Sequence, residues 1–153
     1  MTKVSFHNAG LSQAEDLASL RARAMRPSLE AVGRYDPDRA RARVLSEFDP
    51  TATWTIRVDD TDVGFFVLRD KVDHLYLDHL YVDTPFQNQG IGRAVVSHVQ
   101  ELGLYQAKPV RLIALIKSPA NAFYLARGFR EIAQNGVDVT YEWRAERTGT
   151  EPK

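Results

Sequence analysis

The chain has 153 residues, of which 44% are hydrophobic and 26% charged, and these proportions are typical of one globular domain. Lysine plus arginine and aspartate plus glutamate both number 20, so no excess of positive charge indicates a nucleic-acid partner. The absence of cysteine excludes disulfides, thiolate nucleophiles and cysteine-ligated metals, and the lack of a long apolar run or of a signal peptide predicts a cytoplasmic protein with no membrane partner.

The first third of the chain predicts a short strand followed by two helices. Ser12 and Glu15 have the spacing of a capping box at the start of the first helix. Pro27 is expected to break or kink that helix, because proline has no N–H to donate. Asp36 and Pro37 have the residue types that cap and begin a second helix.

The rest of the chain alternates between strand and helix patterns. The predicted strands are residues 3–7, a hairpin over 53–69, residues 74–82, residues 110–116 and a terminal hairpin around Asn135-Gly136, with further helices from 91 to about 107 and from 119 to 127. The order is strand, helix, helix, three strands, helix, strand, helix, two strands. We expect one α/β domain over residues 1–145, a mixed central sheet of about seven strands flanked by about four helices, and a polar tail at 146–153.

The stretch TPFQNQGIGRAVV, residues 84–96, places two glycines where a helix should begin. The first N–H groups of a helix have no internal partner and attract phosphate, and Gly90 and Gly92 leave room for that approach. A Walker loop requires Lys-Ser/Thr after the glycines, whereas Arg93 follows Gly92, and a dinucleotide fingerprint requires a small residue where Val95 stands. The glycines alone fit a turn and close packing equally well.

The wider segment LYVDTPFQNQGIGRAVV resembles the acetyl-CoA-binding segment of the GCN5-related N-acetyltransferase (GNAT) family. The family signature is Q/R-x-x-G-x-G/A, and residues 87–92 match it in full. A second family segment, F-Y-x-x-x-G-F, matches residues 123–129, and the predicted order of elements fits the family's order. The resemblance implies a GNAT-like fold and an acetyl-CoA-dependent N-acetyltransferase that moves the acetyl group directly onto a primary amine of a small molecule or peptide. A non-catalytic acyl-CoA-binding sensor or interaction module of the same fold is the alternative.

The resemblance also implies acetyl-CoA as co-substrate, with no metal. In the family, loop N–H groups hold the CoA pyrophosphate, the central strand pairs with the pantetheine arm, and the N–H near Val82 is the natural donor to the tetrahedral intermediate. The expected cofactor-binding residues are Leu80, Tyr81, Val82, Gln87, Asn88, Gln89, Gly90, Ile91, Gly92, Arg93, Asn121 and Tyr124. The chain departs from the family at the second helix, where Lys117-Ser118 replaces the usual asparagine and Asn121 lies inside the helix instead.

Tyr124 occupies the family's general-acid position, and a tyrosine is protonated at neutral pH. Its alternative role is an ordinary aromatic packed on the sheet. For the general base, Asp78 matches a position used by some members, with His79 and His74 as further candidates. Strand alternation places His74, Tyr76 and Asp78 on one face and His79 on the other, unless a bulge intervenes. A water relay without a base also fits.

The first two helices and their connection usually wall the acceptor site in this family, so Met25, Arg26 and Tyr35 are the expected substrate-binding residues. Arg26 or Arg34 would attract a carboxylate on the substrate. The alternative is that Tyr35 packs and the arginines are solvated. A small or amino-acid-like amine, a peptide N-terminus and an aminoglycoside all fit as acceptors. Many family members form dimers, so a homodimer is one expected assembly.

Overall fold

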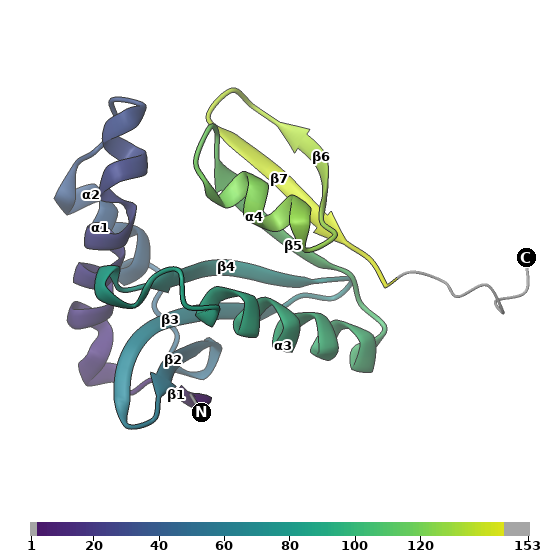
Figure 1. The fold of residues 1–153 in the computed structure, drawn as a ribbon, viewed down its shortest axis with the longest axis horizontal. Coiled ribbons are helices and arrows are strands. Elements are labelled where there is room, and N and C mark those ends of the chain that lie inside the picture. The colour runs from purple at the N-terminus through teal and green to yellow at the C-terminus, as the bar shows by residue number, and fades with distance from the viewer. Residues whose placement is uncertain (1–2, 146–153) are drawn as a thin grey trace, which may run out of the picture. The chain divides into compact units, whose positions relative to one another are not determined.

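The structure, a computed structural model, describes residues 3–145, so the predicted tail lies outside the described residues. Its strands and α-helices follow the predicted order (Figure 1). They are β1 (Val4–Asn8), α1 (Ala14–Ala31), α2 (Pro37–Leu45), β2 (Thr53–Val58), β3 (Thr61–Asp70), β4 (Leu75–Val82), α3 (Ile91–Gln106), β5 (Val110–Leu115), α4 (Ala120–Ala126), β6 (Arg130–Gln134) and β7 (Asp138–Trp143). The seven strands form a mixed sheet in the order β1-β2-β3-β4-β5-β7-β6, which confirms the predicted α/β class.

The chain divides into two compact units. The first contains the described residues up to Arg69 together with Leu77–Val95, and the second contains Asp70–Tyr76 and the described residues from Val96 onward. The first unit therefore holds β1, β2, most of β3 and β4, the helices α1 and α2, and the start of α3. The second holds most of α3, the strands β5, β6 and β7, and α4.

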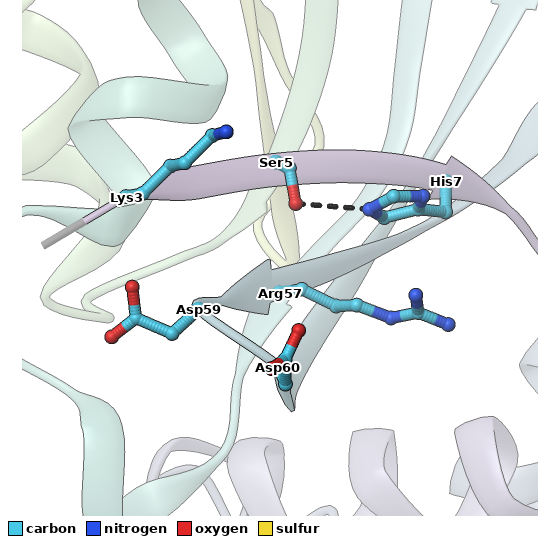
Figure 2. Close-up of a pocket in the computed structure, with 6 residues that line it drawn as sticks. All are labelled: Lys3, Ser5, His7, Arg57, Asp59 and Asp60. Carbon is cyan, nitrogen blue, oxygen red and sulfur yellow. Dashed lines mark hydrogen bonds between the residues drawn. The ribbon is translucent and has the colours of Figure 1, made fainter.

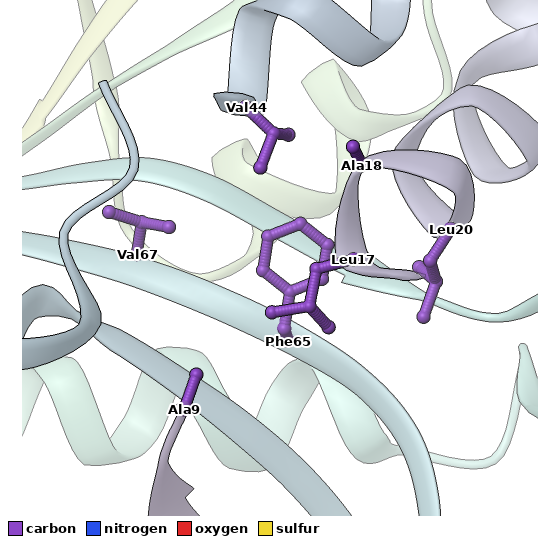
Figure 3. Close-up of a cluster of buried hydrophobic side chains, with 7 residues drawn as sticks. All are labelled: Ala9, Leu17, Ala18, Leu20, Val44, Phe65 and Val67. Atoms are coloured by element: carbon purple, nitrogen blue, oxygen red, sulfur yellow. The ribbon is translucent and has the colours of Figure 1, made fainter. Parts of the chain in front are cut away.

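In the first unit, α1 and α2 pack against the strands through apolar side chains spaced three or four residues apart. Figure 3 shows side chains from both helices converging on Phe65 of β3. The buried cluster consists of Ala9, Leu17, Ala18, Leu20, Val44, Phe65 and Val67. Full burial of a leucine or phenylalanine side chain stabilises a fold by about 2 kcal/mol, so this cluster fixes the two helices against β3. Tyr81, near the end of β4, packs against the same cluster.

The helix α1 continues through Pro27 to Ala31, so the break expected as one outcome at Pro27 does not occur. An interior proline costs about 3 kcal/mol through a lost hydrogen bond and a clash. Pro27 is exposed, and the helix is held by the buried packing of its earlier turns. Gly33 ends the helix, with φ at +69° and its N–H donated to the Glu30 carbonyl at 3.0 Å.

The two predicted helix starts have different outcomes. The prediction of a capping box from Ser12 to Glu15 is wrong, because a short 3₁₀ turn precedes the helix and α1 begins only at Ala14. The Gly10 N–H instead donates to the Gln13 side chain at 2.8 Å. The start of α2 is confirmed, since the Asp36 carboxylate accepts two backbone N–H groups of the first turn at 3.0 and 3.2 Å.

A β-bulge and one glycine bring β3 close to the end of β4. The register between β2 and β3 shifts next to Ile56, which lies opposite Gly64. A Cβ atom at residue 64 would lie 2.2 Å from the carbonyl oxygen of Tyr81 and 3.1 Å from the Cα atom of Val82. Only glycine therefore allows this approach, and the Val63 carbonyl accepts the Asp83 N–H at 2.8 Å beside it.

Gly64→Ala is expected to lower the free energy of unfolding by about 3 kcal/mol, because its methyl group meets main-chain atoms that cannot rotate away. Urea denaturation measures this difference. Gly10→Ala is the matched control, because an added Cβ there meets nothing nearer than 3.9 Å and φ is −92°. Equal, small changes in both variants would contradict the assigned close approach.

The second unit is an antiparallel sheet of β5, β7 and β6 with α4 beside β5 (Figure 1). The Asn135-Gly136 turn closes the predicted hairpin between β6 and β7, with Gly136 at φ +86° and two N–H groups donated to the Asn135 side chain. On β7, the buried Glu142 carboxylate accepts hydrogen bonds from Arg111 at 2.9 Å and Arg144 at 2.7 Å.

Candidate functional site

The segment after β4 is held by two polar side chains. Asp83 accepts the N–H of the next residue at 3.0 Å and two hydrogen bonds from Arg23 of α1 at 3.2 and 2.9 Å. These hydrogen bonds from Arg23 lower the pKa of the Asp83 carboxyl group. The Gln87 side chain donates to the Val82 carbonyl at 2.9 Å. Both contacts fix the entrance of the predicted cofactor loop to the end of β4.

The loop then turns sharply into α3. Asn88 has a φ of +65° and Gly90 a φ of +81°, both in the left-handed region. The Ala94 N–H donates to the Gly90 carbonyl at 3.1 Å as the first bond of the helix, so the N–H groups of residues 91–93 precede the helical ladder. Residues 87–90 are exposed, whereas Ile91 is buried and anchors the helix.

This geometry suits an anion. The N–H groups that precede the ladder carry the positive end of the helix dipole, and a phosphate accepts hydrogen bonds from such groups. Nothing lies within 4 Å of the position that a Cβ atom would take at Gly90, so that side of the turn is open to a ligand. The Arg93 side chain is exposed on the first turn of α3 and adds positive charge there.

A cluster of charged and polar groups surrounds the middle of β4. Asp78 forms ion pairs with Arg43 of α2 at 3.1 Å and with Arg69 of β3 at 3.0 Å, and its side chain is 6% exposed. Arg43 also contacts the His79 ring nitrogen Nε2 at 3.3 Å. The predicted separation of Asp78 and His79 to opposite faces is wrong, because both reach Arg43 and their side chains approach to 3.8 Å. Arg43 of α2 thus contacts both side chains.

The His79 ring is linked to Tyr81 and then to Arg21 of α1. The His79 Nδ1 atom lies 2.8 Å from the Tyr81 hydroxyl, which accepts a hydrogen bond from Arg21 Nε at 2.8 Å. A guanidinium has no acceptor atom, so Nε2 accepts from Arg43 and the neutral ring carries its proton on Nδ1. The Tyr81 hydroxyl oxygen therefore accepts from both neighbours.

The electrostatics of this cluster disfavour both predicted bases. Burial lowers the pKa of His79 to about 3, with further lowering by the arginines, although Asp78 opposes it. Burial opposes ionisation of Asp78, but its charged neighbours, including Arg69 and Arg43, outweigh it and lower its pKa. A carboxylate with a lowered pKa and an imidazole with so low a pKa are weak proton acceptors.

Between about pH 6 and pH 4, His79 is expected to make the protein less stable as the pH falls. Its pKa is about 3 in the folded state and 6.5 ordinarily, so the unfolded chain binds the extra proton, and the slope approaches about 1.4 kcal/mol per pH unit. The contribution of Asp78 is lost only at lower pH, since its ordinary pKa is already 3.8 and its folded pKa lies below that. Urea denaturation of His79→Gln across this range should give a flatter pH dependence. The exposed His7 provides the control, His7→Gln, and an unchanged slope in His79→Gln would refute the assignment.

Tyr124, the predicted general acid, lies in the second unit on the seven-residue helix α4. It is 8% exposed, and its ring contacts Phe129 at 5.6 Å and Tyr141 at 6.4 Å between centroids. Its carbonyl oxygen accepts the Phe129 N–H at 3.1 Å across Gly128, whose φ of +94° ends the helix. The F-Y-x-x-x-G-F segment thus builds an aromatic cluster that holds the Tyr124 ring.

Asn121 is engaged within the protein. Its amide nitrogen donates to the carbonyl oxygens of Leu115 and Ser118, both at 2.9 Å, and its amide oxygen accepts from the Tyr141 hydroxyl at 2.8 Å. These contacts shape the turn between β5 and α4. The amide oxygen has a second lone pair that could accept from the cofactor, so that role of Asn121 stays a prediction.

The expected acceptor residues lie at the end of α1 and in the connection to α2. Arg26 pairs with Glu30 at 2.9 Å and lies over the Tyr35 ring at 5.0 Å from the centroid, while Met25 is half-buried. Arg26 is therefore already paired with a carboxylate, and Arg34 is exposed. His74, the third base candidate, lies in the second unit and contacts Asp73 at 2.7 Å.

A separate shallow pocket of about 420 Å³ lies along β1 and the turn after β2 (Figure 2). Its lining residues are Lys3, Ser5, His7, Arg57, Asp59 and Asp60. Figure 2 shows the Ser5 hydroxyl directed at His7 Nε2, at 2.9 Å. Positive and negative side chains are mixed around this pocket, and it contains none of the predicted site residues.

Sequence reasoning missed Arg21, Arg43 and Arg69. The helical period could have indicated Arg21. This residue follows Leu17 by four positions and therefore lies on the buried face of α1. Within residues 3–145, no three histidine, aspartate or glutamate side chains gather as metal ligands would. Over the same residues, no helix has both the length and the apolar character needed to cross a bilayer.

The order of elements and the mixed sheet define an α/β protein whose central strand leads through a glycine turn into a helix. The family model described as an acetyltransferase (GNAT) domain matches residues 49–131. The chain therefore belongs to the GNAT family, which confirms the resemblance seen in the sequence. No curated protein matches it by sequence.

Solved structures share the fold at low identity. The PaiA N-acetyltransferase from Thermoplasma acidophilum, in complex with coenzyme A, has a TM-score of 0.77 at 14% identity, with 94% of this chain and 99% of that one covered. The ribosomal-protein-S18-alanine N-acetyltransferase from Escherichia coli has a TM-score of 0.67 at 16% identity, covering 100% and 99%. A GNAT family acetyltransferase from Elizabethkingia anophelis, with acetyl-CoA bound, has a TM-score of 0.61 at 18% identity, covering 94% and 98%.

Proposed function

We propose that the protein is an acetyl-CoA-dependent N-acetyltransferase that transfers the acetyl group directly to a primary amine. The start of α3 carries this proposal: its first N–H groups precede the helical ladder, behind an exposed glycine turn with a left-handed backbone. That arrangement would hold the CoA pyrophosphate on residues 89–93. The matching family model and the relatives with bound coenzyme A or acetyl-CoA support the same donor.

In the proposed reaction, the neutral amine nitrogen attacks the thioester carbonyl carbon. Leu80–Val82 would align the pantetheine arm, and the Val82 N–H would stabilise the oxyanion. The carbon–sulfur bond then breaks, and the departing sulfur takes the proton of the Tyr124 hydroxyl. Tyr124 recovers a proton from solvent. Its burial and its aromatic neighbours support a fixed hydroxyl position for this transfer.

The amine must also lose a proton, and we assign that step to water. Asp78 is held between two guanidiniums and His79 has both ring nitrogens in contacts, so each has a lowered affinity for protons. A chain of water molecules leading to solvent accepts the proton without a dedicated base. Asp78 and His79 then hold the polar cluster beside β4 rather than take part in proton transfer.

The test is release of free CoA thiol from acetyl-CoA with a panel of primary amines, together with the melting temperature of the protein with acetyl-CoA. Thiol release that depends on an amine, with an increase in melting temperature, is expected. An increase without thiol release for any amine would favour the alternative, a non-catalytic acyl-CoA-binding module. No increase and no release would overturn the proposed donor.

A further inference from the structure

Arg21 is a half-buried cation without a carboxylate partner. Within residues 3–145 it forms no ion pair, and its two hydrogen bonds go to neutral oxygens, from Nε to the Tyr81 hydroxyl at 2.8 Å and from Nη1 to the Ala40 carbonyl at 3.1 Å. Its guanidinium also lies over the Tyr81 ring, 5.6 Å from the centroid. A partly desolvated charge without a counter-ion costs free energy, so this arrangement requires an explanation.

The groups next to Arg21 do not neutralise it. Burial raises the pKa of Tyr81 and lowers that of His79, so both are neutral at pH 7. Arg43 and Arg69 share the single carboxylate of Asp78. A further carboxylate, Asp49, is hydrogen-bonded to Thr51, and Arg69 contributes to the lowering of its pKa. Positive charge therefore exceeds negative charge around the middle and end of β4.

Most other half-buried arginines among residues 3–145 pair with a carboxylate, whereas Arg127 lies over the Phe123 ring, 5.8 Å from its centroid. Arg69 has Asp78 and Arg111 has Glu142, each within 3.0 Å. On α1 itself, Arg23 and Arg26 each have a carboxylate at 2.9 Å. Arg21 bonds instead to the neutral side chain of Tyr81, which adjoins Val82 in the segment proposed to hold the pantetheine arm. Arg21 is therefore a half-buried arginine without a carboxylate partner that lies beside the proposed reaction centre.

The geometry points to an acceptor amine that carries a carboxylate, bound by Arg21. The Nη2 group of Arg21 makes no hydrogen bond within the described residues, and a guanidinium binds a carboxylate through paired N–H donors. Arg43 and Arg69 add positive potential without giving up Asp78. This inference rests on the proposed function and specifies its substrate class as amino-acid-like amines rather than neutral or polycationic ones.

Matched substrates test the inference. Each amino acid of a panel is compared with the amine obtained by removing its carboxyl group, in wild-type protein and in Arg21→Gln, which loses the charge but keeps an amide donor. For each pair, kcat/KM of the amino acid is divided by kcat/KM of the amine that lacks the carboxyl group. This ratio should fall about 30-fold in Arg21→Gln because KM for the amino acid increases, while kcat/KM for the amine without a carboxyl group stays unchanged. The two substrates of a pair differ in the pKa of the amine. That difference is the same for wild-type protein and the variant, so it cancels when their ratios are compared.

Arg41→Gln is the control, because Arg41 lies on α2 and pairs with Glu15, and it should keep the wild-type ratio. An unchanged ratio in folded Arg21→Gln, with amines still acetylated, would overturn the carboxylate site and leave the proposed function standing. If no amine is acetylated, the proposed function fails. The carboxylate site is then tested by the binding of the amino acids to the protein. The amino acids should then raise the melting temperature of wild-type protein and not that of Arg21→Gln, and equal increases would overturn the inference.

Discussion

Gly90→Ala is expected to raise the dissociation constant of acetyl-CoA at least about tenfold. An alanine at a φ of +81° is strained by about 1 kcal/mol, and relief of that strain rotates the loop N–H groups away from the pyrophosphate. Any methyl group that stays in place projects into open space, where only a ligand would meet it. Isothermal titration calorimetry measures the change in affinity.

Gly136→Ala is a close control for this variant. Gly136 is exposed, has a φ of +86° and has nothing within 4 Å of an added Cβ, so both variants should lose about 1 kcal/mol of stability. Only Gly90→Ala should lose affinity for acetyl-CoA. Equal affinities in the two variants would mean that the glycine turn serves the fold alone.

Tyr124→Phe is expected to lower kcat about 100-fold, because it removes the proton donor to the departing thiolate. The ring and its contacts with Phe129 and Tyr141 are kept. Steady-state kinetics over a pH range measure the change. In wild-type protein kcat should decline at alkaline pH as the tyrosine ionises, and the variant should lose that decline.

Tyr105→Phe removes a hydroxyl from an 89% exposed ring on α3 and should leave kcat unchanged. A wild-type kcat in Tyr124→Phe would remove Tyr124 from the mechanism. A lower kcat with the alkaline decline retained would indicate a packing role for the ring instead.

Much of the fold was predictable from local patterns. The Asn135-Gly136 turn and the cap at Asp36 are set by short-range chemistry, and both lie where expected. The course of α1 was not predictable in this way. Pro27 disfavours a helix locally, but the burial of Leu17 and Leu20 stabilises the helix through tertiary packing. The helix propensities of single residues predict a helix only weakly where tertiary packing determines the backbone conformation.

In the candidate site too, the local features were predictable from the sequence and the long-range contacts were not. The loop from Gln87 to Arg93 is contiguous in sequence, so its turn at Gly90 and its open helix start could be inferred from residue types. The cluster at Asp78 and His79 depends on arginines about 10 to 60 residues away in the chain. Nothing local to β4 indicates that two of those arginines, Arg43 and Arg69, pair with Asp78 and lower its basicity.

The fate of a labelled acetyl group distinguishes acetyl transfer to an amine from hydrolysis of acetyl-CoA. The protein is incubated with acetyl-CoA labelled in the acetyl group and with a primary amine of the carboxylate-bearing class, and the products are measured by mass spectrometry. We expect an amide that carries the label, formed in an amount equal to that of free CoA. Free CoA with labelled acetate and no amide would contradict it, since water rather than an amine would then be the acceptor.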